Sequence, residues 1–264
     1  MSFSPEHGDG PDTSPGDAGW DIPALIQWLE TELAGITTGL GEWNLEYFST
    51  QHQRFASDLD IIRRCQDGGE VLEVGSVPCH MTTLLKRLGY SVTGVDPRPE
   101  SSGHLIEKFG LDVRKCDIET EPLPFEDESF GLIVFTEVFE HLRIDPIYTM
   151  GELRRVLRPG GRLFLSTPNL YASKMVARYL LGRGLFSPYE QFEMLRTHGF
   201  MGHVREYSPA EMRDFMEKCG FSIDEHLFRT YKEYGPIKGF IYDLLPKLKQ
   251  FQILLCSRAD IPTK

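Results

Sequence analysis

Two types of metal-ligating side chain are spaced in a way that suits a divalent-cation site. Glu137, Glu140 and His141 stand at positions i, i+3 and i+4, so a helical turn would place them on one face. His203 follows in a later segment, just before a predicted helix. Mixed oxygen and nitrogen ligands suit Mg²⁺, Mn²⁺ or Zn²⁺ and leave positions open for substrate oxygens. We therefore expect these four residues to bind one cation, with Glu140, His141 and His203 acting in catalysis.

The same histidines allow an interpretation without a metal. A neutral imidazole can take a proton from an acceptor as a general base, or can serve only as a structural hydrogen-bonding group. The spacing alone does not choose between these roles.

A nucleotide-binding turn is predicted after the first buried strand. That strand carries Glu73 near its end and is followed by Gly75, which lets a ligand approach the backbone. The next apolar run ends in Asp96, about 20 residues further on, where an acid typically accepts hydrogen bonds from ribose hydroxyls. Neither piece alone is specific.

The elements that must position these residues follow a βαβ rhythm. Short apolar runs alternate with helical patterns, which is typical of a mostly parallel sheet covered by helices on both faces. Strands are expected at Glu70–Val74, Ser91–Val95, Asp112–Lys115, Gly131–Thr136, Arg162–Ser166, Ser222–Thr230 and Gln250–Ser257. Helices are expected at Asp21–Ala34, Leu45–Cys65, Met81–Leu88, Ser101–Phe109, Pro146–Leu157 and Pro209–Gly220. The fold class is therefore a doubly wound α/β domain.

The chain divides into three parts. Residues 1–20 are rich in Gly, Pro, Ser and Asp and are expected to form a disordered tail. Residues 21–66 form a helical N-terminal cap, and residues 67–264 form the catalytic domain. Within that domain the rhythm breaks at residues 170–205, which we interpret as a lid insertion. A short helix is expected in the later insertion at residues 231–249.

Three further motifs give the pattern its specificity. They are Cys116-Asp117-Ile118, Leu123-Pro124-Phe125-Glu126-Asp127 and Leu157-Arg158-Pro159-Gly160-Gly161. With the earlier segments, this series resembles the class I S-adenosylmethionine (SAM)-dependent methyltransferases, especially the branch that includes ubiquinone-biosynthesis O-methyltransferases. The resemblance implies a seven-stranded Rossmann-like sheet that binds SAM through Glu73, Gly75, Asp96, Asp117, Ile118 and Thr136.

By this resemblance, Gly75 and its neighbours hold the methionine part of SAM, and Asp96 binds the ribose hydroxyls. Asp117 receives the adenine amino group, while Ile118 packs on the ring. The set formed by Glu137, Glu140, His141 and His203 is also similar to the metal site of small-RNA 2′-O-methyltransferases.

The glycine turn departs from the family pattern GxGxG. Val77 and Cys79 occupy the second and third glycine positions. Either Pro78 shapes the turn instead, or SAM binding is weakened or lost. If SAM binding is lost, the chain is a non-catalytic binding protein.

Composition and net charge limit the classes of partner that the chain is expected to bind. The formal net charge of −11 disfavours a nucleic-acid substrate, and no apolar run is long enough for a membrane span, so we expect neither partner. Five cysteines without a CxxC pair and the lack of a signal peptide predict free thiols and a cytoplasmic protein. The oligomeric state stays open, with a homodimer possible.

We expect the function to be SAM-dependent O-methylation of a small-molecule hydroxyl, assisted by Mg²⁺, Mn²⁺ or Zn²⁺. The lid insertion favours a saccharide or a glycosylated metabolite as the acceptor. The alternatives are metal-independent N- or C-methylation, catechol O-methylation and RNA 2′-O-methylation.

Overall fold

The computed structural model describes residues 19–36, 41–65, 69–184, 186–198, 201–231 and 234–259. Residues 1–18 of the predicted tail lie outside this part. Trp20, which the sequence analysis placed in the tail, packs against Trp28 and lies under the Arg87 guanidinium. The packed body therefore starts before residue 21, because an indole of this size adds apolar area to the cap.

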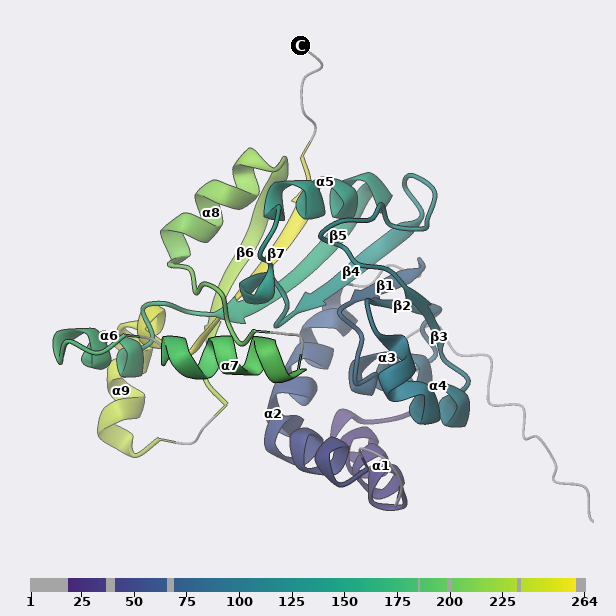
Figure 1. Cartoon of the computed structure of the whole chain (residues 1–264), viewed down its shortest axis with the longest axis horizontal. Coiled ribbons are helices and arrows are strands. Elements are labelled where there is room, and N and C mark those ends of the chain that lie inside the picture. Colours follow the sequence, from purple (N-terminus) through teal and green to yellow (C-terminus); the bar gives the residue numbers. More distant parts are fainter. Residues whose placement is uncertain are drawn as a thin grey trace, which may run out of the picture.

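Seven strands form one sheet in the order β3-β2-β1-β4-β5-β7-β6 (Figure 1). The strands are β1 (Val71–Val74), β2 (Val92–Asp96), β3 (Asp112–Lys115), β4 (Phe130–Thr136), β5 (Leu157–Pro168), β6 (Phe221–Arg229) and β7 (Phe251–Arg258). Strand β7 pairs antiparallel with β5 and β6, whereas β1 to β5 pair in parallel. The order reverses between β1 and β4, which is where a doubly wound sheet opens a binding crevice. The predicted α/β fold is confirmed.

Helices cover both faces of the sheet. One face carries α1 (Ile22–Ala34), α2 (Gly41–Cys65), α3 (His80–Arg87) and α4 (Gly103–Phe109), and the other carries α5 (Pro146–Val156) and α8 (Pro209–Lys218). Strand β4 serves both cores, since Leu132 and Val134 pack on the first side and Ile133 and Phe135 on the second. A strand buried on both faces reads as a continuous apolar run.

Helix α8 begins where the sequence indicates. The Ser208 hydroxyl accepts from the Glu211 N–H, the Glu211 carboxylate accepts from the Ser208 N–H, and Pro209 occupies the first turn. This capping box fixes the chain just after His203.

The region expected as an irregular lid contains two helices, α6 (Ser173–Leu180) and α7 (Pro188–His198). They were not predicted from the sequence, although Met175, Val176, Tyr179 and Leu180 of α6 recur at helical spacing. The predicted short helix in the later insertion is α9 (Pro236–Leu244). Figure 1 shows α7 at the carboxyl edge of β4 and β5, with α6 and α9 at the periphery.

Three short 3₁₀ helices complete the elements: η1 (Pro99–Ser102), η2 (Phe139–His141) and η3 (Pro246–Leu248). All five cysteines are free thiols, as expected. Among the helices that the structure describes, none combines the length and apolar content needed to cross a bilayer.

Candidate active site

Five predicted cofactor-binding residues lie at or just beyond the carboxyl ends of neighbouring parallel strands. Glu73 is the third residue of β1, Asp96 ends β2 and Thr136 ends β4. Asp117 and Ile118 follow β3 by two and three residues. Because β3, β2, β1 and β4 are adjacent in the sheet, these residues share one edge. Their contacts with SAM stay predictions.

Asp96 holds the turn that follows β1. Its Oδ2 accepts from the Val77 N–H at 3.2 Å and its Oδ1 accepts from the Arg98 N–H at 2.8 Å. Burial raises the pKa of this carboxyl, and the two backbone N–H groups oppose that rise. Each carboxylate oxygen has a second lone pair, so Asp96 can also accept from ribose hydroxyls.

The turn after β1 has positive φ angles at Gly75 and at Cys79, although Cys79 replaces a glycine of the family pattern. Gly75 has a φ of +74°, and a Cβ added there would collide with Val138. Cys79 has a φ of +69°, in the left-handed region, although it is not glycine. Its thiol is fully buried and precedes α3, and the Val77–Pro78 peptide bond is cis. The chain therefore keeps a left-handed residue at Cys79, a position where the family pattern GxGxG has glycine.

We predict that Cys79→Gly destabilises the protein less than Cys79→Ala. Both variants lose the packed thiol, but only glycine removes the cost of the left-handed backbone, about 1–2 kcal/mol. Thermal unfolding of the two variants beside the wild type measures the difference. A lower melting temperature for Cys79→Gly than for Cys79→Ala would contradict the idea that the left-handed backbone at Cys79 is strained.

Glu73 is buried against α3 instead of facing solvent. Its carboxyl is hydrogen-bonded by the Thr82 hydroxyl and is 5% exposed. Burial raises the pKa of Glu73 to about 8, while Thr82 and Arg54 act in the opposite direction. Arg54 of α2 is itself buried, so the helical cap supplies a positive charge to this part of the strand edge.

The raised pKa of Glu73 predicts a pH-dependent loss of stability. In the unfolded chain this carboxyl ionises near pH 4.5, whereas in the fold it stays protonated up to about pH 8. The stabilisation is therefore full below pH 4.5 and is lost as the pH rises toward and through 8. Glu73→Gln removes this dependence and should be more stable than wild type at pH 9, by on the order of 2 kcal/mol. Denaturant unfolding at pH 6 and pH 9 checks this, and an equal pH response of both proteins would contradict it.

Glu137 does not share a helical turn with Glu140 and His141, so that part of the sequence prediction is wrong. Its φ is +56°, in the left-handed region, which ends β4 abruptly, and only the 3₁₀ helix η2 follows. The Glu137 Oε1 accepts from the Ser166 hydroxyl at 2.8 Å. Glu137 is therefore held against β5, outside the cluster described next.

Glu140, His141 and His203 come together as a three-residue cluster. Their potential ligand atoms all lie within 4.8 Å of one another. The Glu140 Oε1 lies 4.0 Å from the His141 Nε2 and 3.9 Å from the His203 Nε2. Ligand atoms that are adjacent around one cation at about 2.1 Å lie about 3–3.5 Å apart, so the three side chains stand near a common ion and would have to draw closer to bind it.

Hydrogen bonds on the far side of each ring turn both Nε2 atoms toward Glu140. The His141 Nδ1 donates to the Gly202 carbonyl at 3.1 Å, and the His203 Nδ1 donates to the Glu206 Oε1 at 3.2 Å. Both partners are acceptors, so each Nδ1 carries its proton, and a neutral ring in this tautomer presents the Nε2 lone pair as a possible ligand. A carbonyl or carboxylate behind the imidazole is the usual support of a metal-bound histidine.

A hydrogen bond also orients the Glu140 carboxylate. Its Oε2 accepts from the Thr167 hydroxyl at 2.9 Å, while its Oε1 is buried and has no hydrogen-bond partner. The main-chain oxygen of Glu140 accepts from the Val204 N–H at 2.8 Å, which brings the His203 segment to this edge. An unpartnered buried carboxylate oxygen between two free imidazole nitrogens is what a cation would satisfy.

The pKa shifts of the residues in and beside the cluster also favour a bound cation. Burial, together with the neighbouring Glu137, raises the pKa of Glu140 well above its usual range. Burial also raises the pKa of Glu137 and lowers that of His141, which His203 lowers further. Several buried carboxyl groups close together are costly to ionise unless a positive charge joins them.

Sequence reasoning missed Glu206 and Thr167, which support the cluster. Glu206 stands three residues after His203, and this spacing was the available signal. Thr167 lies near the end of β5, the strand next to β4, and only the strand register could have indicated it. Supporting residues of this kind follow from the fold more than from a motif.

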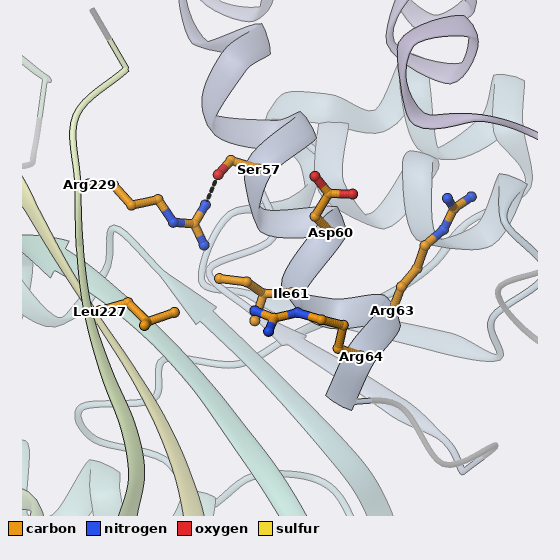
Figure 2. A pocket seen from close by; sticks show the side chains of 7 residues that line it. All are labelled: Ser57, Asp60, Ile61, Arg63, Arg64, Leu227 and Arg229. Carbon is orange, nitrogen blue, oxygen red and sulfur yellow. Dashed lines mark hydrogen bonds between the residues drawn. The ribbon is translucent and has the colours of Figure 1, made fainter.

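A separate hollow lies between α2 and β6. Figure 2 shows Arg229 reaching from β6 to Ser57 of α2, with Arg64 lying beside Ile61. Arg229 also pairs with the buried Asp58 at 3.4 Å. These contacts fasten the cap to the sheet, and the hollow shares none of its lining residues with the histidine cluster.

The chain matches a family model described as a methyltransferase domain over residues 46–226. It is 30% identical over 190 residues to a probable S-adenosylmethionine-dependent methyltransferase of Mycolicibacterium smegmatis, covering 72% of this chain and 64% of that one. It is 31% identical over 182 residues to the mitochondrial ubiquinone biosynthesis O-methyltransferase of Rattus norvegicus, covering 66% and 49%. The chain thus spans about half to two thirds of the length of these relatives.

Solved structures agree on the fold. A SAM-dependent methyltransferase of Thermotoga maritima, described as a possible histamine N-methyltransferase, superposes with a TM-score of 0.56 at 19% identity, over 89% of this chain and 99% of that one. A SAM-dependent methyltransferase of Methanosarcina mazei gives 0.53 at 21% identity, over 75% and 97%. With the strand order, the Asp96-held turn and the family match, the chain belongs to the class I SAM-dependent methyltransferase family.

Proposed function

We propose that this protein transfers a methyl group from SAM to a hydroxyl oxygen, assisted by a divalent cation held by Glu140, His141 and His203. The observation that carries the proposal is the unpartnered Glu140 Oε1, which lies between two imidazoles whose free nitrogens face it. Among methyl acceptors, a hydroxyl is the one that gains most from a nearby cation, because its proton must be lost.

SAM supplies an electrophilic methyl group when it is bound at the strand edge. The residues expected to hold it are Asp96, toward the ribose hydroxyls, and Asp117, toward the adenine amino group. The backbone beside Gly75 is expected to approach the methionine part, and the Val138 side chain packed against it leaves no room for a larger residue at this position. These contacts position the methyl group relative to the acceptor, which is the main contribution of a protein to an in-line displacement.

A divalent cation lowers the pKa of a hydroxyl that it binds and fixes the position of the oxygen. The chain's own residues prepare its place: Gly202 and Glu206 hold the two imidazoles, and Thr167 holds the Glu140 carboxylate. With only three protein ligands, further positions stay open for acceptor oxygens. A vicinal pair of hydroxyls would use two of them and would bind better than one.

For the acceptor we favour a catechol-like diol on an apolar molecule over the saccharide expected from the lid insertion. The insertion exposes large apolar side chains, among them Phe192 at 62% and Leu180 at 83%, which suit an apolar acceptor better than a sugar. The names of several relatives also place O-methylation within this family.

The test combines binding with turnover. Chelator-treated protein is titrated with Mn²⁺ and with SAM by calorimetry, then given radiolabelled SAM with an alkylcatechol, an alkylphenol or a methyl glucoside. We expect both ligands to bind, and label to reach the alkylcatechol only after metal is added. Equal turnover before and after chelation would reject the cation and leave His141 or His203 as a general base. Failure to bind SAM would favour a non-catalytic role.

A further inference from the structure

Helix α9 turns its apolar stripe to solvent. Ile237, Phe240, Ile241 and Leu244 are spaced at i, i+3, i+4 and i+7, and so form one face. Their exposures are 80, 71, 42 and 67%, whereas Tyr242 is buried. A surface helix normally packs such a face against its own core, so α9 presents a surface for something outside the chain.

Helix α6 extends this apolar surface. No residue of α6, which the structure describes in full, is buried, and Tyr179, Leu180 and Leu181 are 46, 83 and 72% exposed. The Ser173 hydroxyl is 2.7 Å from the Tyr242 hydroxyl, which joins the two helices, and Figure 1 shows them side by side. We call this the α6/α9 surface, made by Tyr179, Leu180, Leu181, Ile237, Phe240, Ile241, Leu244 and Leu245.

The charge around the α6/α9 surface is opposite to that of the whole chain. Residues 173–183 and 236–249 contain six basic residues and one acidic residue, Asp243. The chain as a whole has a formal charge of −11. The basic residues are Lys174, Arg178, Arg183, Lys238, Lys247 and Lys249. Apolar side chains mixed with lysine and arginine on exposed helices are typical of a surface that binds anionic lipid.

We propose that the α6/α9 surface docks on an anionic lipid bilayer, with both helices lying in the plane of the headgroups. This proposal replaces the expectation of no membrane partner, which rested only on the lack of an apolar run long enough to span a bilayer. The acidic remainder of the chain then points away from the membrane, because like charges repel. A second copy fits less well, since a two-fold contact would bring each basic surface against its own counterpart. This docking is independent of the proposed reaction.

The position of the surface has a consequence for the active site. The chain runs from the end of β5 through α6 and α7 to Gly202 and His203, so the docking helices and the histidine cluster belong to one connected region. Asn169, just after β5, also donates to the Lys247 and Lys249 carbonyls at 2.8 Å and links this region to the segment after α9. An acceptor dissolved in the bilayer would enter at this end of the molecule.

Vesicle flotation of the full chain tests the docking. Vesicles of phosphatidylcholine alone are compared with vesicles that also contain phosphatidylglycerol, at low and high salt. We expect binding to the anionic vesicles, weakened by salt, and at least about tenfold weaker binding for Leu180→Ser/Phe240→Ser/Leu244→Ser. Ile147→Ser is the matched control, because Ile147 is equally apolar and 67% exposed but lies on α5.

Calorimetric SAM affinity and melting temperature show that each variant is folded. Wild-type protein that stays unbound to anionic vesicles would overturn the proposal, as would equal flotation of the triple variant. Light scattering that shows a dimer abolished by the triple variant, without vesicle binding, would assign the surface to a second copy instead. Loss of methyl transfer with normal flotation would reject the proposed function but not the docking.

Discussion

Glu140→Gln is expected to abolish methyl transfer and to weaken Mn²⁺ binding by about 100-fold or more, with SAM affinity unchanged. The amide keeps the shape of the side chain and an oxygen for Thr167, but removes the negative charge that faces the two imidazoles. Most SAM contacts are expected at the ends of β1, β2 and β3, and the one expected on β4, at Thr136, does not involve the Glu140 carboxylate. Calorimetry with Mn²⁺ and SAM, together with single-turnover assays, separates the two effects.

Three further variants sharpen this prediction. His203→Ala should match Glu140→Gln, because it removes a ligand of the same cluster. Glu206→Gln should weaken Mn²⁺ binding by about 10- to 100-fold, as expected for a residue that only orients a ligand. Glu190→Gln is the control, since Glu190 is exposed on α7. Wild-type Mn²⁺ affinity in both Glu140→Gln and His203→Ala would exclude the cation site.

The sheet could be predicted because each strand carries its own local signal. Runs buried on both faces are continuously apolar, and turn residues bound them, so the expected strand at Gly131–Thr136 agrees with β4 to within one residue. The positions of Asp96 and Asp117 followed, since parallel strands bring their carboxyl ends to one edge. These features depend on neighbours in the sequence.

The parts that failed depend on contacts that the sequence does not reveal. Glu137 was assigned to a helical turn by its spacing, yet its left-handed backbone and its bond to Ser166 come from pairing with β5. Helices α6 and α7 were not recognised: they are short and lie in a segment where the alternation of strand and helix patterns is interrupted. At Cys79 the missing glycine left open whether the turn keeps its shape or SAM binding is weakened, and the chain keeps the left-handed conformation there.

Asp96→Ala is expected to lower SAM affinity by about 100-fold or more. Two charge-assisted hydrogen bonds to the ribose would be lost, each contributing about 1.5–3 kcal/mol. The substitution also leaves the Val77 and Arg98 N–H groups without their acceptor, so the turn that shapes the site would loosen. Calorimetry below the melting temperature measures the SAM affinity of the variant, and thermal unfolding measures the stability lost when the turn loosens.

Asp96→Asn distinguishes the two consequences, because the amide oxygen can still accept one backbone hydrogen bond while the charge is gone. We expect it to recover much of the melting temperature but to bind SAM at least about tenfold more weakly than wild type. Asp127→Ala is the matched control, since this acid is exposed and pairs only with the Arg155 guanidinium among the contacts described. If Asp96→Ala binds SAM as tightly as the control variant does, Asp96 shapes the turn alone, and the ribose must be held by other groups at the strand edge.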